Sequence, residues 1–556
     1  MGLARAHAIA LVGVQGHPVE IEADIENGMV ALLLVGLPDT ALREARDRIR
    51  SAIVNSGETW PSRRITVGLS PASLPKRGSG FDLGIAMAIL AAAESVPAAG
   101  LDGLVLIGEL GLDGRVRPVP GVLPAAAAAA AAGFAAVAVA AENAAEAALV
   151  PELRVIAVPS LAAFTAWIRN GQPASDGAVQ VLEPGRDIAA LFQAIHEGGP
   201  AGALAPARSP DGTAGAAGPV PGNGAARANV PAPESLPAKD LADLVGQPVA
   251  RRAAEICAAG GHHLMLLGPP GVGKTMLAER IPTVLPRLEP AAALEVSAIH
   301  SVAGTLRPGR PLVVEPPFCA PHHTATRAAI VGGGSGIIKP GAASLAHHGC
   351  LFLDEAPEFG RDVLDGLRQP LESGEIVVAR AGVTARFPAK FTLIMAANPC
   401  ACASARTAGA GCSCTPLARR RYLARLSGPL LDRVDAKIEF LPVRRAELLS
   451  DRAFTEPSSV VAERVLAARH RAAARLAGTP WRLNAQIPGS ELRRRFAPAT
   501  GALAPLERAM DLGRISARGA DRAIRLSWTL ADLAGIQRPG AAEVGYALGL
   551  WLGTPL

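Results

Sequence analysis

Apolar and polar positions divide this chain into four regions. Strand-like and helix-like runs alternate over residues 1–170, which predicts an α/β domain. Residues 171–236 are rich in Gly, Ala, Pro and Ser with few large apolar side chains, so we expect a flexible linker. A second mixed region spans residues 237–442, and residues 443–556 show helical apolar spacing without a strong strand. The pattern therefore predicts a multidomain α/β protein with a helical C-terminal domain.

A short apolar run followed by a glycine-rich turn stands near the start of the second mixed region. Leu264–Leu267 reads as a buried strand, and Met276–Arg280 opens a helix. The eight residues between them fit G-x-x-x-x-G-K-[ST], whose backbone N–H groups form a nest for phosphate oxygens. The lysine of this pattern can reach the β- and γ-phosphates, and its threonine can bind Mg²⁺. The sequence thus predicts a site for ATP or GTP at Gly268, Pro269, Pro270, Gly271, Val272, Gly273, Lys274 and Thr275.

Two further strands end in polar residues that suit the same site. Leu351–Leu353 is followed by Asp354 and Glu355, which are expected to hold Mg²⁺ and to polarise the attacking water. Phe391–Ala397 ends at Asn398, which would fall beside the γ-phosphate. The alternative for Asn398 is an ordinary turn residue before a proline.

The phosphate loop, the paired acids and Asn398 together resemble the AAA+ ATPases. Four longer stretches narrow the resemblance to the magnesium-chelatase-like branch: Phe318–Thr324, Pro340–His347, Leu367–Glu372 and Leu426–Arg433. With its N-terminal and C-terminal regions, the chain resembles the YifB/ComM family throughout, apart from the linker.

This resemblance implies a homo-hexameric ring with ATP at the subunit interfaces. Arg433 matches the arginine that a neighbouring subunit contributes, where positive charge stabilises the departing phosphoryl group. Arg522 matches a sensor in the helical lid, with Arg518 and Arg525 as close rivals. The alternative for each arginine is an ordinary surface ion pair.

The N-terminal region resembles the proteolytic domain of Lon, which has a ribosomal protein S5-like fold. The resemblance rests on Gly108–Gly121 and Leu74–Asp82. Lon uses a serine that is activated by a lysine. In this chain that lysine should fall near Leu123, but no lysine is present there. Ser79 is one residue out of register with the nucleophile, and Gly80 aligns instead. We therefore expect a Lon-like domain that is not a protease and that serves assembly or substrate gripping.

Composition adds a basic tendency without deciding the partner. The 556 residues carry a net charge of +6, and the pI is about 9.1. Residues 443–556 hold 17 Arg and no Lys against 10 Asp plus Glu, with concentrations at Arg469–Arg471 and Arg493–Arg495. Such density can neutralise DNA phosphates, or it can serve ion pairs of a solvated lid. No signal peptide and no membrane-spanning run is evident, so we expect a cytoplasmic protein.

Four of the seven cysteines cluster in one short segment. Cys400, Cys402, Cys412 and Cys414 bracket a Gly/Ala/Ser-rich stretch and can offer four thiolates to a structural Zn²⁺. Their C-x-C spacing is tighter than the usual C-x-x-C, and free thiols are the alternative. His322 and His323 lack a neighbouring metal-binding cluster in the sequence, which favours a loop at the ring pore or the nucleotide interface.

The family resemblance implies an ATP- and Mg²⁺-dependent motor acting on single-stranded or branched DNA. Members of this type act as branch-migration helicases during natural transformation. One rival is a metal-insertion or protein-remodelling ATPase like the magnesium-chelatase subunit. Another is a binding scaffold switched by ATP, which the acids at Asp354 and Glu355 disfavour because a switch has no need of a water-positioning group.

Overall fold

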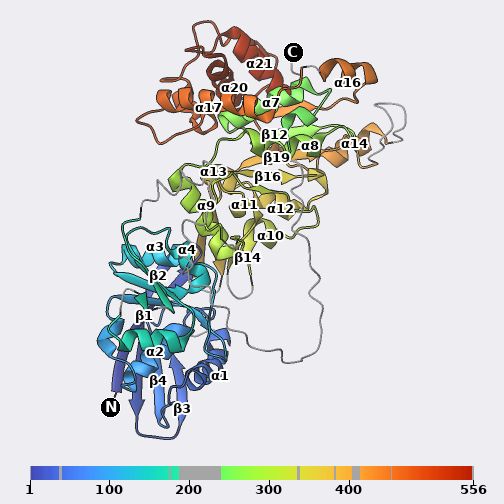
Figure 1. The fold of residues 1–556 in the computed structure, drawn as a ribbon. Helices are drawn as coiled ribbons and strands as arrows, with labels where there is room; N and C mark the ends of the chain where they lie inside the picture. Colours follow the sequence, from blue (N-terminus) through green and yellow to red (C-terminus); the bar gives the residue numbers. More distant parts are fainter. Residues whose placement is uncertain are drawn as a thin grey trace.

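The computed structural model shows three successive parts of the chain (Figure 1). The blue and cyan N-terminal part lies at one end, the sheet that carries β12, β16 and β19 lies in the middle, and the orange and red C-terminal helices lie at the other end. The structure describes residues 2–36, 40–172, 175–176, 178–186, 239–307, 309–334, 338–380, 383–402, 414–452 and 454–553.

The described N-terminal residues form a nine-stranded sheet in the order β10-β11-β9-β8-β5-β1-β2-β4-β3. Its longest ladder is antiparallel, from Gly2 opposite Ile25 to Val12 opposite Gln15. The strands are β1 (Gly2–Val12), β2 (Gln15–Glu26), β3 (Ala31–Val35), β4 (Arg64–Ser70), β5 (Leu104–Ile107), β8 (Ala136–Ala140), β9 (Arg154–Val158), β10 (Ser175–Asp176) and β11 (Val179–Leu182), with a separate pair β6 (Glu109–Leu110) and β7 (Val116–Arg117).

Helices cover this sheet, and one of them is buried along its whole length. Every residue of α2 (Asp82–Ala92) is buried, which fits its almost wholly apolar sequence. The other helical elements are α1 (Thr40–Asn55), η1 (Ala98–Leu101), α3 (Val122–Ala131), η2 (Ala141–Asn143), α4 (Ala144–Ala147) and α5 (Leu161–Arg169).

The first residues of the predicted linker belong to this sheet. β11 pairs antiparallel with β9, with Val181 opposite Ile156, and β10 pairs with β11. The alternation of apolar residues in Val179–Leu182 accounts for this pairing, because Val179 is buried against the core. Residues 187–236 of the predicted linker lie outside the described residues.

The middle part is built on a sheet whose described strands are all parallel, in the order β13-β16-β19-β12-β20. Three of its strands read as continuous apolar runs, as expected for strands covered on both faces. The strands are β12 (Leu264–Leu267), β13 (Phe318–Cys319), β16 (Cys350–Leu353), β19 (Thr392–Ala397) and β20 (Ala436–Glu439), with two small hairpins, β14 (Gly332–Gly333) with β15 (Lys339–Pro340) and β17 (Glu375–Arg380) with β18 (Val383–Pro388).

Short helices surround this sheet. They are η4 (Leu241–Asp243), α7 (Pro248–Gly260), α8 (Lys274–Ala278), η5 (Ile281–Val284), α9 (Pro290–Ala303), α10 (Arg327–Val331), α11 (Ala342–Leu345), η6 (Ala356–Glu358), α12 (Arg361–Gly366), α13 (Pro370–Ser373), α14 (Pro416–Leu423) and α15 (Gly428–Leu431).

The C-terminal elements are helical, as the apolar spacing predicts. They pack on α7 and share a core with it that includes Ala253, Val465 and Ala523. The elements are α16 (Arg445–Asp451), α17 (Ser458–Arg475), η7 (Asn484–Gln486), α18 (Gly489–Leu492), α19 (Ala504–Asp511), α20 (Ala517–Ala534) and α21 (Ala541–Leu552). None of the helices in the described part of the chain has the length and apolar character needed to cross a bilayer.

The N-terminal and middle parts share buried surface through α9. Ala293 and Val296 of α9 belong to one apolar cluster with Val122 and Ala126 of α3. At the end of α9, the Gly121 N–H donates to the Ser301 carbonyl over 3.1 Å. The Ser301 hydroxyl donates in turn to the buried Glu146 carboxylate.

Candidate functional site

The glycine-rich turn joins β12 to α8, and its glycines occur where a Cβ would clash or where the backbone angle disfavours other residues. Gly271 (φ +80°) and Gly273 (φ +98°) have left-handed backbone angles that residues with a Cβ rarely adopt. A Cβ on Gly268 would lie 2.7 Å from Phe440. The turn therefore has the open backbone that a phosphate-binding loop needs at a helix N-terminus.

Lys274 lies inside this loop and reaches the end of a second strand. Its Nζ donates to the carbonyls of Gly268 (2.7 Å) and Pro269 (2.8 Å) and to Oδ1 of Asn398 (3.1 Å). Burial lowers the pKa of Lys274, against the opposing effect of the nearby carboxylates. The structure thus brings Asn398 beside the lysine, as the sequence predicts.

Thr275 and Asp354, the two predicted magnesium ligands, lie side by side. The Thr275 hydroxyl donates to Oδ2 of Asp354 over 2.7 Å. The other carboxylate oxygen, Oδ1, accepts from the Glu355 N–H at 2.9 Å. A hydroxyl in the first turn of α8 and a carboxylate directly after β16 suit a Mg²⁺ ion that also binds phosphate oxygens.

Glu355 has a backbone conformation that is unusual for its residue type. Its φ of +51° lies in the left-handed region, and its side chain is 48% exposed. His323 Nδ1 is 3.3 Å from Glu355 Oε2, which places the His322–His323 loop at this site. Strained residues often occur at active sites, and here the strain aims a carboxylate beside the proposed metal ligands.

Arg433 is engaged within its own chain. Its guanidinium donates to the Pro429 carbonyl and to the Glu372 carboxylate. The Arg433 side chain is 14% exposed, whereas that of Glu372 is 65% exposed. The structure describes one chain, so the predicted action of Arg433 in a neighbouring subunit stays a prediction.

The structure does not bring Arg522 to the phosphate loop. Arg522 donates to Asp435, whose other oxygen accepts from the His263 N–H at 2.9 Å. Asp435 and His263 stand just before β20 and β12, at the amino ends of strands, whereas Gly268 follows the carboxyl end of β12. Although burial alone would raise it, Arg522 and the nearby histidines hold the pKa of Asp435 well below its usual range.

The two rival arginines have different surroundings, and a sensor role for either stays a prediction. Arg525 Nε donates to the Ile487 carbonyl at 2.7 Å, and Arg518 is exposed on the first turn of α20. In this conformation Arg522 therefore acts as the partner of a buried carboxylate rather than as a nucleotide contact.

A cavity of about 330 Å³ between the start of α7 and α16 was not predicted from the sequence. Gln247 links its wall to the loop, because its Nε2 donates to the Leu441 carbonyl (2.9 Å) and lies 3.5 Å from the Val272 carbonyl. The only sequence signal was the Asp-Leu-Val-Gly-Gln run before α7. The lining residues are Gly246, Pro248, Glu447, Ser450, Asp451 and Phe454.

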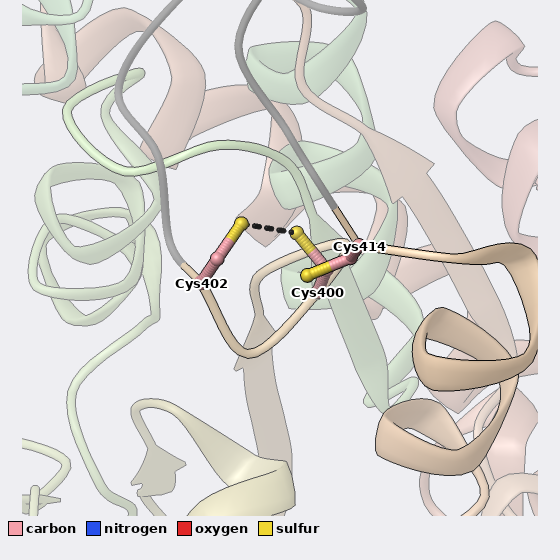
Figure 2. A group of neighbouring side chains, drawn as sticks. All are labelled: Cys400, Cys402 and Cys414. Atoms are coloured by element: carbon pink, nitrogen blue, oxygen red, sulfur yellow. Dashed lines mark hydrogen bonds between the residues drawn. The ribbon is translucent and has the colours of Figure 1, made fainter.

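Three of the four clustered cysteines come together (Figure 2). The sulfur atoms of Cys400, Cys402 and Cys414 all lie within 4.8 Å of one another, and those of Cys400 and Cys402 are 3.2 Å apart. Cys412, the fourth predicted ligand, lies outside the described residues. The described cysteines form no disulfide.

Polar residues of the N-terminal domain are paired with one another. Ser79 donates to the Glu109 carboxylate, and Arg48 Nε donates to the fully buried Asp82 at 2.6 Å. Burial raises the pKa of Asp82 to about 6 against the opposing effect of Arg48. Lys76 is fully buried and donates to a backbone carbonyl, and burial lowers its pKa.

Part of the C-terminal arginine set is bound within the chain. Arg469 Nη2 donates to the Ala258 carbonyl at the end of α7 over 2.7 Å, and burial lowers its pKa to about 10. Arg471 donates to the Asp532 carbonyl, and Arg493 pairs with Asp521 at 2.6 Å. In the two predicted concentrations, these three arginines serve contacts within the lid and with α7.

Comparison with protein-family models finds three matches along the chain. Residues 21–143 match the model for subunit ChlI of magnesium chelatase. Residues 240–448 match the model for magnesium chelatase subunit ChlI, and residues 455–550 match its C-terminal model.

Comparison with curated proteins finds relatives that match nearly the whole chain. An uncharacterized protein of Mycobacterium tuberculosis is 46% identical over 548 residues, which cover 99% of this chain and 98% of the relative. The uncharacterized protein YifB of Escherichia coli is 38% identical, over 96% of this chain and 94% of the relative. The competence protein ComM of Haemophilus influenzae is 38% identical, over 99% and 97% respectively.

Proposed function

Since this chain belongs to the YifB/ComM family of magnesium-chelatase-like AAA+ ATPases, we propose that it is an ATP-driven motor that acts on DNA. In this proposal it forms a homo-hexamer and migrates branched DNA during natural transformation and recombination. One observation carries the motor assignment, namely that Lys274, Thr275, Asp354 and Asn398 converge by direct hydrogen bonds. The link to DNA uptake rests on similarity over almost the whole length to a competence protein.

The residues of the site divide the chemistry between them. Bound ATP and Mg²⁺ supply the transferable phosphoryl group and the charge that neutralises it. When ATP binds, Lys274 would exchange its hydrogen bonds to the loop carbonyls for hydrogen bonds to phosphate oxygens. Thr275 and Asp354 would be ligands of the Mg²⁺ ion. Glu355 orients and polarises the attacking water, with His323 against its carboxylate. Asn398 is placed to report whether the γ-phosphate is present, because it already contacts Lys274.

The cavity beside Gln247 is where we place the nucleotide base. Gln247, which lies between the lining residues Gly246 and Pro248, bonds the Val272 carbonyl of the phosphate loop, and the Phe454 ring offers an apolar wall. Arg433 would act on the ATP of the neighbouring subunit, after leaving the exposed Glu372. Zn²⁺ at Cys400, Cys402 and Cys414 would be a structural addition to ATP and Mg²⁺, and a cytoplasmic location belongs to the same proposal.

We assign the N-terminal domain a Lon-like fold without peptidase chemistry. Ser79 faces the Glu109 carboxylate, which is no substitute for the lysine base of a Ser–Lys dyad. The domain would instead serve assembly or grip a substrate, and its bonds to α9 give it a direct connection to the motor.

ATP hydrolysis by the purified protein, with and without single-stranded and branched DNA, tests this function. Lys274→Ala is the blank. Stimulation by DNA that vanishes in the blank is expected, and strand displacement would follow as the next assay. Robust hydrolysis that ignores DNA would overturn the DNA motor and favour the metal-insertion or protein-remodelling ATPase.

A second variant distinguishes an ATP-hydrolysing motor from a binding scaffold that is switched by ATP. Glu355→Gln should bind ATP and hold it without turnover, because the water loses its base. Unchanged turnover in Glu355→Gln would show that this acid is not the base, and binding of DNA without any turnover in the native protein would favour the scaffold.

A further inference from the structure

Three of the described cysteines, Cys400, Cys402 and Cys414, form a cluster although the third is separated from the first two along the chain. Cys400 and Cys402 follow β19, whereas Cys414 stands just before α14 (Figure 2). Cys400 is buried, Cys414 is half-buried and Cys402 is exposed. All three sulfurs point into one small volume, within 4.8 Å of one another.

The separation of the sulfurs fits thiolates around one metal ion. Four sulfurs bound to Zn²⁺ at about 2.3 Å lie about 3.8 Å apart in a tetrahedron. The 3.2 Å between the sulfurs of Cys400 and Cys402 is about 0.6 Å shorter than this value and well beyond the length of about 2.05 Å of a disulfide. Three thiolates leave one tetrahedral position, which water or another side chain can take.

Another cluster of potential ligands, Glu295 with His347 and His348, lacks this chemistry. The Lys390 N–H donates to His347 Nδ1 at 2.9 Å, so the proton of the neutral ring is on Nε2. That Nε2 is 3.1 Å from Glu295, to which it donates, and it therefore has no lone pair for a metal. The cysteines are the stronger candidate.

The cysteine cluster is connected to the catalytic acids through α14. Tyr422 of α14 is buried, and the pKa of its hydroxyl is raised to about 12, first by burial and then by Glu358 and Glu355. Arg425, just after α14, donates to Glu358 of η6 at 2.8 Å. η6 begins directly after Glu355, so the position of α14 bears on the position of that carboxylate.

We propose that Cys400, Cys402 and Cys414 bind a Zn²⁺ ion that fixes the start of α14 next to Asn398. The metal joins the strand that ends at Asn398 to the helix that packs beside Glu355. It therefore positions the ATPase site without touching ATP. The metal site itself is independent of any action on DNA, whereas its effect on turnover rests on the proposed ATPase function.

Metal content of the full-length protein tests the site directly. We expect one Zn²⁺ per chain by elemental analysis, and the thiolate-to-metal charge-transfer and tetrahedral d–d bands of Co²⁺ after exchange. Cys402→Ser removes an exposed ligand with little risk to folding, and it should lower the bound metal about tenfold or more. Cys319→Ser, which changes a half-buried cysteine outside the cluster, should keep the metal.

One result would overturn the proposal: native protein that hydrolyses ATP, yet holds less than a tenth of an equivalent of zinc and shows no thiolate–Co²⁺ bands. Equal metal content in Cys402→Ser and in native protein would do so as well. Neither result depends on DNA, so a failure here is distinct from a failure of the DNA motor.

The positioning role has its own measurement. Removal of zinc by a chelator should lower kcat about tenfold, since a shift of the water-orienting acid by an ångström is costly, while the Kd for a fluorescent ATP analogue stays within about twofold. Added Zn²⁺ should restore kcat in native protein but not in Cys402→Ser. Metal-free protein with full kcat would sink the positioning role.

Discussion

The phosphate-loop site and the polar cluster of the N-terminal domain use similar residues in opposite ways. At the phosphate loop, Lys274 and Thr275 begin α8, Asp354 directly follows β16, and the adjoining Glu355 is half exposed. In the N-terminal domain, Arg48 and Asp82 are turned toward each other, and Asp82 is fully buried. The polar groups at the phosphate loop can exchange their partners for those of a ligand, whereas Arg48 and Asp82 stabilise the fold through their contact with each other.

The largest expected effect is on the phosphate-loop side of this contrast. Lys274→Ala should reduce ATP turnover by at least about a hundredfold, because the charge on the transferred phosphoryl group loses its preorganised partner. Arg48→Ala should leave turnover per folded molecule within about twofold. Steady-state hydrolysis of both variants checks this, and a similar loss in Arg48→Ala would mean that the N-terminal cluster takes part in the chemistry.

The Arg48→Ala change, which should hardly affect turnover, should lower the stability of the N-terminal domain. Arg48→Ala leaves the Asp82 carboxylate buried without its partner, which should cost about 3 kcal/mol of stability in the N-terminal domain. Arg5→Ala is the matched control, since its pair with Glu22 is exposed and worth at most about 1 kcal/mol. Hydrogen exchange of the α2 amides measures both, and equal protection in the two variants would contradict the assigned role of the buried pair.

Acidification should separate the two regions further. Burial lowers the pKa of His263 to about 4, and its Nδ1 accepts from the Leu393 N–H at 3.0 Å. The neutral ring of this half-buried residue contributes about 2 kcal/mol to the free energy of unfolding at pH values above about 6.5, the pKa of histidine in the unfolded chain. This contribution is lost as the pH falls toward 4. Asp82 has the opposite sign, because its raised pKa of about 6 means that its contribution is present at low pH and lost as the pH rises through 6.

Hydrogen exchange at pH 6.5 and 4.5, corrected for the intrinsic rates, measures this difference. We expect β12 and β19 to lose protection while α2 keeps it, and His263→Gln should reduce the loss. Uniform loss of protection in both regions would show that other groups dominate the acid response.

The smallest expected effect is at the contact between the regions. Ser301→Ala removes the hydroxyl that bonds Glu146, which should weaken the docking of the N-terminal domain on α9 by about 1 kcal/mol. Ser344→Ala is the control, because its buried hydroxyl has no hydrogen-bond partner among the described residues. Exchange of the α3 amides measures the effect, and identical values for both variants would remove Ser301 from the docking contact.

The local parts of the nucleotide site could be predicted because each is encoded in a few adjacent residues. The glycines of the loop and the apolar strands ending at Asp354 and Asn398 carry their signal in sequence order, and parallel strands then bring their ends together. The apolar spacing of residues 443–556 likewise predicts the helical C-terminal part, whose described regular elements are helices.

Long-range pairings could not be predicted. Asp435 and Arg522 are separated by most of the lid, and only the fold shows that Arg522 is bound at the amino ends of the strands. The cavity near Gln247 and the bond from Ser301 to Glu146 have the same origin, because each needs surfaces from regions far apart in the chain. β11 was missed for another reason, since four residues of alternation are too short to stand out in a Gly- and Ala-rich stretch.

The position of α9 has a consequence for how this protein can be taken apart. A cut in the linker that the sequence predicts at residues 171–236 would separate the N-terminal region from the rest, yet α9 presents Ala293 and Val296 to the N-terminal apolar cluster. An ATPase fragment released by such a cut would expose that face to water and would tend to self-associate. An N-terminal domain exchanged between relatives would likewise need a matching α9. The part of the chain that must be exchanged together is therefore larger than residues 1–170, the N-terminal region that the sequence delimits.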